Sequence, residues 1–71
     1  MDQIKIGRFI ADMRKEQGLT QRQLAETLDV SNRTISKWEC GDGLPDLANV
    51  LPLCDALGIT ADELLYGERK K

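Results

Sequence analysis

Apolar residues recur at intervals of three and four positions along most of the chain, which is the spacing of one face of an α-helix. No segment alternates apolar and polar residues over enough positions to form a β-strand. The chain is therefore expected to be all helix. The first predicted helix ends near Gly18, a suitable C-terminal cap. Its apolar face consists of Ile6, Phe9, Ile10 and Met13.

Two short helices with a tight connection follow. Thr20 and Gln23 have the spacing of a capping box and predict the start of the second helix. Asp29 stands where this helix must end, and Asp is one of the few residues besides glycine that tolerate a positive φ. Ser31 is the expected N-cap of a third helix over residues 32–39. The apolar residues of the second helix are Leu24, Ala25 and Leu28.

Two more helices complete the predicted fold. Asp46 is expected to cap a fourth helix that stops at Gly58. Thr60 and Glu63 form a second capping box, which starts a short last helix over residues 61–66. The apolar stripe of the fourth helix is predicted to consist of Leu47, Val50, Leu51, Cys54 and Leu57.

Length and composition indicate one folded unit. The 71 residues are fewer than most single domains contain, and 41% hydrophobic with 31% charged residues is too apolar for a disordered chain. We expect one domain over residues 1–67 and a basic disordered tail over residues 68–71. No apolar run approaches the roughly 20 residues that a membrane-spanning helix needs, and no signal peptide is recognisable, so we expect a cytoplasmic protein without a membrane partner.

The reactive side chains exclude several classes of site. The chain has two cysteines, Cys40 and Cys54, and no histidine, so a zinc site of two Cys and two His is impossible. Both cysteines are expected to be free thiols in a reducing compartment. Without histidine, a placed nucleophile or a glycine-rich phosphate loop, we expect no enzyme, no cofactor, no metal and no small-molecule ligand.

Charge is distributed unevenly along the chain. The net charge of -2 would by itself argue against a nucleic-acid partner. However, residues 1–38 hold seven basic and five acidic side chains, whereas residues 39–68 hold seven acidic and no basic ones. Such segregation can give the protein one positive and one negative face, although an ordinary charged surface would fit the same numbers.

The third predicted helix has an unusual polar face. At about 100° per residue, Ile35 and Trp38 lie on the side opposite that face and are expected in the core. Asn and Arg can form paired hydrogen bonds with adenine and guanine, and Ser and Lys can contact bases or phosphates. The face therefore suits the major groove of DNA, and a solvated helix face is the alternative. Its residues are Asn32, Arg33, Ser36 and Lys37.

The connection between the second and third helices supports the interpretation that this polar face enters the major groove of DNA. Two short helices joined by a tight turn let the first cross the DNA backbone while the second inserts its N-terminal residues into the groove, as in a helix-turn-helix. The free amides after Thr20 and Ser31 would attract phosphate oxygens on the same side.

The sequence from residue 19 to residue 41 resembles the helix-turn-helix of the phage-repressor and Cro superfamily, the XRE-type regulators. Residues 44–46 and 57–65 are similar to that family's fourth and fifth helices, and the resemblance covers about residues 4–67. It implies a compact, five-helix, lambda-repressor-like DNA-binding domain with the motif at helices 2 and 3. Asp29 departs from the family's usual glycine. The matching residues are Leu19, Thr20, Gln21, Arg22, Gln23, Leu24, Ala25, Val30, Ser31, Ile35, Ser36, Trp38, Glu39 and Gly41.

The resemblance also implies roles for individual residues. Arg14 and Glu39 match positions that often form a charge pair between helix 1 and the end of helix 3, with Ile35 and Trp38 supporting the recognition helix from the core. The residues implied to contact bases are Asn32, Arg33, Ser36 and Lys37. The implied phosphate contacts are Gln21, Ser31, Thr34 and the backbone near Gly41, with Arg14 as a further candidate.

Double-stranded DNA and a second copy of the chain are the implied partners, because members of this family usually bind near-palindromic operators as twofold dimers. Leu64, Leu65 and Tyr66 are candidate dimer contacts, and closing the core is their alternative role. With no sensor or activation domain recognisable, operator occupancy is expected to repress transcription. The alternative function is an antitoxin-type or other protein-interaction module that uses the acidic second half.

Overall fold

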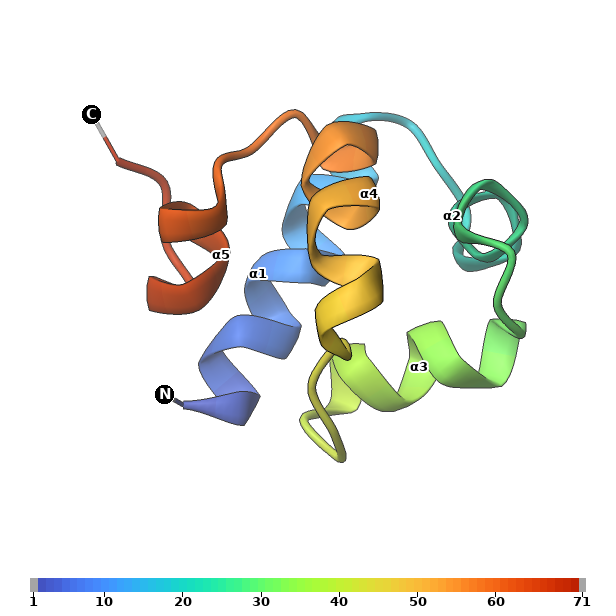
Figure 1. Cartoon of the computed structure of the whole chain (residues 1–71), viewed down its shortest axis with the longest axis horizontal. Coiled ribbons are helices and arrows are strands. Elements are labelled where there is room, and N and C mark those ends of the chain that lie inside the picture. Colours follow the sequence, from blue (N-terminus) through green and yellow to red (C-terminus); the bar gives the residue numbers. More distant parts are fainter. Residues whose placement is uncertain (1, 71) are drawn as a thin grey trace.

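The computed structural model describes residues 2–70, and Met1 and Lys71 lie outside the described residues. The helices are α1 (Gln3–Glu16), α2 (Gln21–Leu28), α3 (Asn32–Cys40), α4 (Leu47–Leu57) and α5 (Ala61–Tyr66). No strand occurs within residues 2–70, so the all-helical prediction is confirmed. In Figure 1, α2 and α5 lie at opposite ends of the molecule, with α1 and α4 between them.

Hydrogen bonds at the start of α2 and α3 follow the predicted caps. Thr20 Oγ1 accepts from the Gln23 amide at 3.0 Å, and the Gln23 side chain accepts from the Thr20 amide at 2.8 Å. Ser31 Oγ accepts from the Thr34 amide at 3.1 Å and so caps α3. These bonds satisfy amides that have no partner inside the helix. They fix the positions at which the two helices begin.

The turn between α2 and α3 depends on Asp29. This residue has φ 57° and ψ 44°, the left-handed conformation that the sequence predicted. Its backbone N–H donates to the carbonyl groups of Ala25 and Glu26, which closes α2. Val30, the next residue, is partly buried against the core. The connection is therefore short and packed, and it sets how α3 leaves α2.

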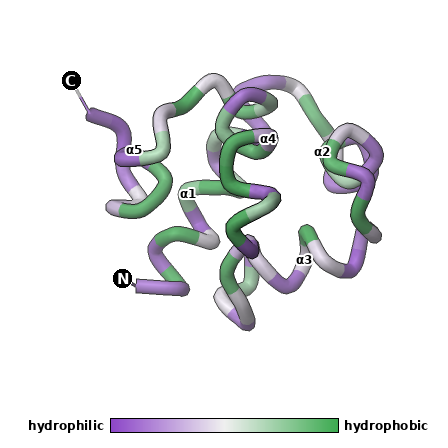
Figure 2. The backbone as a smooth tube through the Cα atoms, viewed as in Figure 1, coloured by the Kyte–Doolittle hydropathy of each residue, from purple (hydrophilic) through white to green (hydrophobic). Residues whose placement is uncertain are grey.

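The core draws side chains from every helix. Ile35 and Trp38 are 0% and 5% exposed, so α3 turns one face inward as predicted and leaves its polar face outside. Figure 2 shows hydrophobic and hydrophilic positions alternating along α1 and α3, whereas α4 is hydrophobic along most of its length. The buried hydrophobic residues are Ile6, Phe9, Ile10, Met13, Leu24, Ala25, Leu28, Ile35, Trp38, Leu53, Cys54, Leu57, Ile59 and Leu64.

The predicted apolar stripe of α4 is wrong in part. Leu47 and Leu51 are 90% and 68% exposed, whereas Leu53, which the stripe omitted, is fully buried. At about 100° per residue, Leu51 lies about 120° around the helix from the buried Leu57 and cannot share its face. Asp46 is the N-cap of α4 by position but makes no side-chain bond to the helix amides, because its carboxylate accepts from the Asn49 side chain instead.

Gly7 allows α1 and α3 to approach closely. A Cβ atom at this position would lie 2.2 Å from the carbonyl oxygen of Trp38 and 2.9 Å from that of Glu39. Both oxygens belong to the last turn of α3, which cannot rotate away as a flexible side chain would. A side chain at residue 7 would therefore force the two helices apart. The crossing fixes the C-terminal end of α3 against the first half of α1.

Residues 68–70 contact α1 and α5. Lys5 Nζ lies 2.8 Å from Glu68 Oε1, and Arg69 Nη2 lies 2.9 Å from Glu16 Oε1. The Lys70 amide donates to Glu63 at 2.9 Å. The domain boundary at residue 67 and the disorder of the tail remain predictions, and Lys71 of that tail lies outside the described residues. In Figure 1 this segment follows α5, at the end of the molecule away from α2.

Candidate nucleic-acid interface

The polar face of α3 lies on the surface. Asn32, Arg33 and Lys37 are exposed, and Ser36 is partly buried. Ile35 lies on the opposite side of the helix in the core. The four residues predicted to contact bases therefore occupy one accessible face, whose N-terminal end begins at the Ser31 cap.

The two basic side chains of this face, Arg33 and Lys37, have no acidic partner among residues 2–70. Among residues 2–70, no carboxylate lies within 4.0 Å of Arg33 or Lys37, and Arg22 approaches Glu26 only at 4.0 Å. By contrast, Arg69 and Lys70 at the other end of the chain are paired with Glu16 and Asp62. Unneutralised positive charge is therefore present on the helix-turn-helix, despite the net negative charge of the chain.

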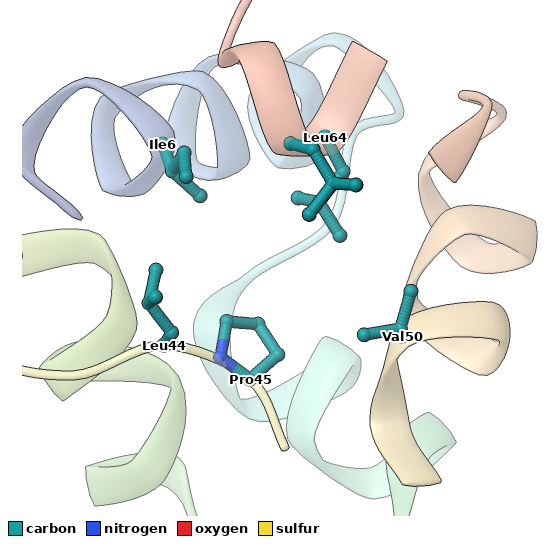
Figure 3. Close-up of a pocket in the computed structure, with 6 residues that line it drawn as sticks. Ile6, Leu44, Pro45, Val50 and Leu64 are labelled. Atoms are coloured by element: carbon teal, nitrogen blue, oxygen red, sulfur yellow. The ribbon is translucent and has the colours of Figure 1, made fainter. Parts of the chain in front are cut away.

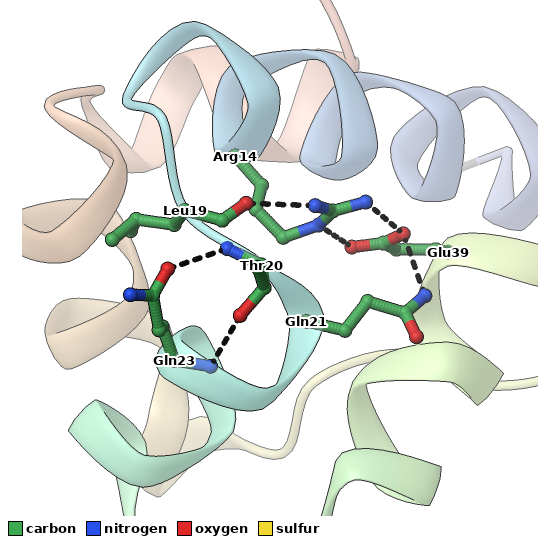
Figure 4. Close-up of polar contacts among 6 residues, drawn as sticks. All are labelled: Arg14, Leu19, Thr20, Gln21, Gln23 and Glu39. Atoms are coloured by element: carbon green, nitrogen blue, oxygen red, sulfur yellow. Dashed lines mark hydrogen bonds and ion pairs between the residues drawn. The ribbon is translucent and has the colours of Figure 1, made fainter.

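A network of hydrogen bonds joins α1, α2 and α3 beneath the polar face. Arg14 Nε and Nη2 donate to the two carboxylate oxygens of Glu39 at 2.6 and 3.1 Å, and Arg14 Nη1 donates to the Leu19 carbonyl at 2.8 Å. Gln21 Nε2 donates to Glu39 Oε1 at 3.0 Å. Figure 4 shows the three side chains converging from three helices. The structure therefore contains the charge pair that the family resemblance implied, and it adds Gln21, a partner that sequence reasoning missed.

The burial and the partners of Arg14 argue against its acting as a direct phosphate ligand. Its side chain is 11% exposed, and that of Glu39 is 8% exposed. Three of its nitrogen donors already serve Glu39 and Leu19, and its charge is matched by the carboxylate. This arrangement favours the structural role of Arg14, which ties α1 to the last turn of α3.

The hydroxyl groups of Ser31 and Thr34 are bonded to each other. Their oxygens lie 2.9 Å apart, and Ser31 Oγ also accepts from the Thr34 amide. Each hydroxyl has one proton, and one of the two protons is used in the bond between them. The pair therefore offers one free O–H donor. Of the two hydroxyls expected to contact phosphate, only one at a time can therefore donate outside the pair.

The backbone amide of Gly41 is already used. It donates to the Trp38 carbonyl at 3.1 Å, and the Asp42 amide donates to the Lys37 carbonyl at 2.9 Å. Both bonds close the C-terminus of α3, so a phosphate contact from the Gly41 N–H is not available in this structure. No backbone carbonyl accepts from Gly43 or Leu44 among the described residues. These two amides are therefore the candidates for the phosphate contact expected from the backbone near Gly41.

The candidate dimer contacts separate into buried and exposed residues. Leu64 is 2% exposed and belongs to the core, which is the alternative role expected for it from the sequence. Leu65 and Tyr66 are 47% and 64% exposed. Figure 3 shows a small apolar groove between α1, α4, α5 and the loop before α4, in which Leu64 forms part of the wall. The residues lining it are Ile6, Leu44, Pro45, Val50, Leu64 and Leu65.

Other kinds of site find little support in the described residues. No three His, Cys, Asp or Glu side chains of residues 2–70 come together in a group able to hold a metal ion. Cys40 is exposed, Cys54 is buried, and both are free thiols. Burial, together with the negative charges of Asp55 and Glu63, raises the pKa of the Cys54 thiol. No helix within residues 2–70 has the length and apolar content needed to cross a membrane.

Two curated proteins are similar to this chain in sequence. The HTH-type transcriptional activator BcrR of Enterococcus faecalis is 44% identical over 59 residues, which are 83% of this chain and 29% of BcrR. The cryptic phage CTXphi transcriptional repressor RstR of Vibrio cholerae is 39% identical over 61 residues, 86% of this chain and 54% of RstR. The chain thus spans about half or less of the length of these two relatives.

A solved structure agrees in fold. The P22 c2 repressor, crystallised in complex with a synthetic operator, matches with a TM-score of 0.84 and 36% identity over 89% of this chain and 96% of that chain. The model of the helix-turn-helix family matches residues 10–64, which include all of α2, α3 and α4. The resemblance to the phage repressors is confirmed, and this chain belongs to the helix-turn-helix family.

Proposed function

We propose that this domain, residues 1–67, binds double-stranded DNA with α3 in the major groove. The observation that carries the proposal is the accessible polar face of α3, on which Arg33 and Lys37 have no acidic partner among the described residues. Paired donors on Arg33 suit guanine, and the amide of Asn32 suits adenine. We place this activity in the cytoplasm, where a reducing environment keeps both thiols free.

Phosphate contacts would hold α3 in the groove. Gln21 lies at the first position of α2, where the backbone amides of the first turn have no partner inside the helix. The Ser31–Thr34 hydroxyl pair supplies one donor, and the loop amides of Gly43 and Leu44 supply others. These contacts would set register and contribute affinity for any sequence, whereas the side chains of α3 would distinguish one site from another.

Two substitutions separate these roles. Arg33→Ala should weaken binding to a site selected from a random oligonucleotide pool by about 1–3 kcal/mol and relax the preference at one base pair. Gln21→Ala should weaken binding to selected and scrambled duplexes by the same factor. Arg69→Ala is the matched control, because it removes an equal charge at the far end of the molecule. Equal losses on both duplexes for Arg33→Ala would refute the assignment of base contacts.

The salt dependence of binding distinguishes DNA binding from a protein-interaction role. Affinity for random duplex should fall steeply as salt rises, since each neutralised phosphate releases counterions. Binding that is weak at low salt and insensitive to it would favour the alternative, a protein-interaction module.

We propose that bound protein represses transcription by occupying an operator. The P22 c2 and RstR proteins are named as repressors, although BcrR is named as an activator. The proposed mechanism involves no chemical step, because a bound domain blocks access to the promoter. A reporter with the selected site across the promoter should lose expression when the protein is supplied. Increased expression from the same reporter would contradict repression.

We further propose that two copies bind a near-palindromic site. Apolar residues that a second copy would cover are exposed on α4 and α5, namely Leu47, Leu51, Leu65 and Tyr66. An isologous interface requires one self-complementary patch, and the mixed charges of Asp2, Lys5 and Asp62 border Leu65 and Tyr66. Tyr66→Glu should lower the dimer fraction in sedimentation without lowering thermal stability at low protein concentration, because Tyr66 is 64% exposed. A sedimentation profile unchanged by Tyr66→Glu would exclude this face.

A further inference from the structure

Glu39 occupies a position from which it can influence phosphate binding without touching DNA. It lies in the last turn of α3, and its carboxylate accepts from Arg14 of α1 and from Gln21 at the start of α2. One side chain thus joins the helix that would contact phosphate to the helix that would contact bases. Gln21 and Glu39 are 18 positions apart in the sequence, and the pattern of apolar positions does not predict their contact.

The carboxylate determines which way the Gln21 amide faces. A side-chain amide has a carbonyl oxygen that only accepts and a nitrogen that donates two protons. An ionised carboxylate only accepts, so the nitrogen of Gln21 must face Glu39. Figure 4 shows this arrangement, with the Gln21 nitrogen toward Glu39 and its oxygen pointing away.

The geometry limits what Gln21 can offer to a phosphate. A phosphodiester has no proton at neutral pH, so it can bond to the Gln21 nitrogen but not to the Gln21 oxygen. One of the two amide protons is used by Glu39. One donor of this amide is left, and its position is fixed by a carboxylate that is itself held by two bonds from Arg14. We propose that Glu39 is a positioning residue for phosphate binding, which holds the Gln21 nitrogen with one proton free for DNA.

This inference rests on the proposed DNA-binding function, and it has a mechanical consequence. Arg14, Gln21 and Glu39 belong to α1, α2 and α3, so the three helices share one polar junction. A phosphate held by Gln21 would then have a fixed distance from the end of α3. The phosphate contact and the base contacts would therefore form together. A Gln21 side chain without its bond to Glu39 could bind phosphate at varying distances from α3.

Two double-mutant cycles test the positioning role. The probe is a random-sequence duplex at low salt, and binding is measured by fluorescence anisotropy. Gln21→Ala should weaken binding about 10- to 100-fold, as expected for the loss of a hydrogen bond to a charged group. Glu39→Gln should weaken binding when Gln21 is present. The same substitution should weaken binding by a factor at least about threefold smaller in the Gln21→Ala background, because the effects of two coupled residues are not additive.

Glu68→Gln is the matched control for the second cycle. It makes the same change from carboxylate to amide in an ion pair with Lys5, at the end of the molecule away from α2. Its effect on binding should be the same with and without Gln21→Ala. If Glu39→Gln also has equal effects in both backgrounds, the positioning role is overturned and Glu39 acts on structure alone. If the unmodified protein binds no duplex at any salt concentration, the proposed function fails, and the positioning role fails with it.

A measurement on the unmodified protein covers the case in which Glu39→Gln does not fold. In a nitrogen–proton NMR correlation spectrum, one side-chain proton of Gln21 should be shifted downfield in the free protein by its bond to the carboxylate. Adding duplex should then shift the second proton. Two Gln21 protons at the positions of a freely solvated amide, before duplex is added, would overturn the proposal.

Discussion

The close crossing of α1 and α3 at Gly7 leads to a stability prediction. In Gly7→Ala, the new Cβ would lie 2.2 Å from the Trp38 carbonyl oxygen, more than 1 Å short of an ordinary contact of 3.4 Å. Overpacking of this kind costs about 3 kcal/mol or more where the neighbour is backbone. Alanine recovers about 1 kcal/mol through its better helix propensity. The expected net loss is about 2 kcal/mol of the free energy of unfolding.

For a domain of this size, a loss of about 2 kcal/mol lowers Tm by about 8–16 °C. The assay is thermal unfolding followed by far-UV circular dichroism. Gly43→Ala is the matched control, because a Cβ at residue 43 meets no atom within 4 Å and the Tm should change little. An unchanged or higher Tm for Gly7→Ala would mean that helix propensity outweighs the clash. The two helices would then not cross as closely as the structure has them.

Three further substitutions test other parts of the fold. Asp29→Gly should raise stability by about 0.5 kcal/mol in urea unfolding, because glycine adopts the left-handed φ of 57° more readily than Asp does, whereas Asp29→Ala should lower it. Leu53→Ala should lower the free energy of unfolding by about 2–5 kcal/mol, because Leu53 is buried. Leu51→Ala should change it by no more than about 0.5 kcal/mol in the monomer, because Leu51 is exposed. Equal losses would refute the orientation of α4. The Thr60 and Lys70 amides donate to the Glu63 carboxylate and lower its pKa in the folded protein. The stability that Glu63 contributes is therefore present above the unfolded pKa of about 4.3. This stability is lost as the pH falls through the lower pKa of the folded state. Glu63→Gln should therefore be less stable than the unmodified protein at neutral pH, with a difference that closes in acid, and a difference independent of pH would contradict this.

Much of the fold could be predicted because its helix ends are encoded locally. Thr20 and Ser31 are cap residues within three positions of the amides they accept from, so spacing in the sequence suffices to find them. Asp29 is similar, since a positive φ depends on the residue and its immediate neighbours. The polar face of α3 also follows from helical periodicity alone. These features place the helix-turn-helix before any long-range contact is known.

The errors concern contacts that no local pattern encodes. In α4 nearly every position is apolar, so periodicity could not decide whether Leu51 or Leu53 faces the core. The bond between Gln21 and Glu39 depends on how three helices cross, and the two residues are 18 positions apart. Gly7 gave no indication of its role in the sequence, because its neighbour is backbone 31 residues away.

Residues 68–70 continue from α5, which lies at the opposite end of the longest axis of the molecule from α2 (Figure 1). A fluorophore, an affinity tag or an immobilising linker attached after Lys70 would therefore stand clear of the surface formed by α2 and the start of α3. Attachment before Gln3 would sit beside the α1–α3 crossing and Gly41, where Ile4 packs within 3.0 Å of a Cβ built on that glycine. Labelling at the C-terminal end thus leaves the DNA-facing side accessible in every binding experiment described above.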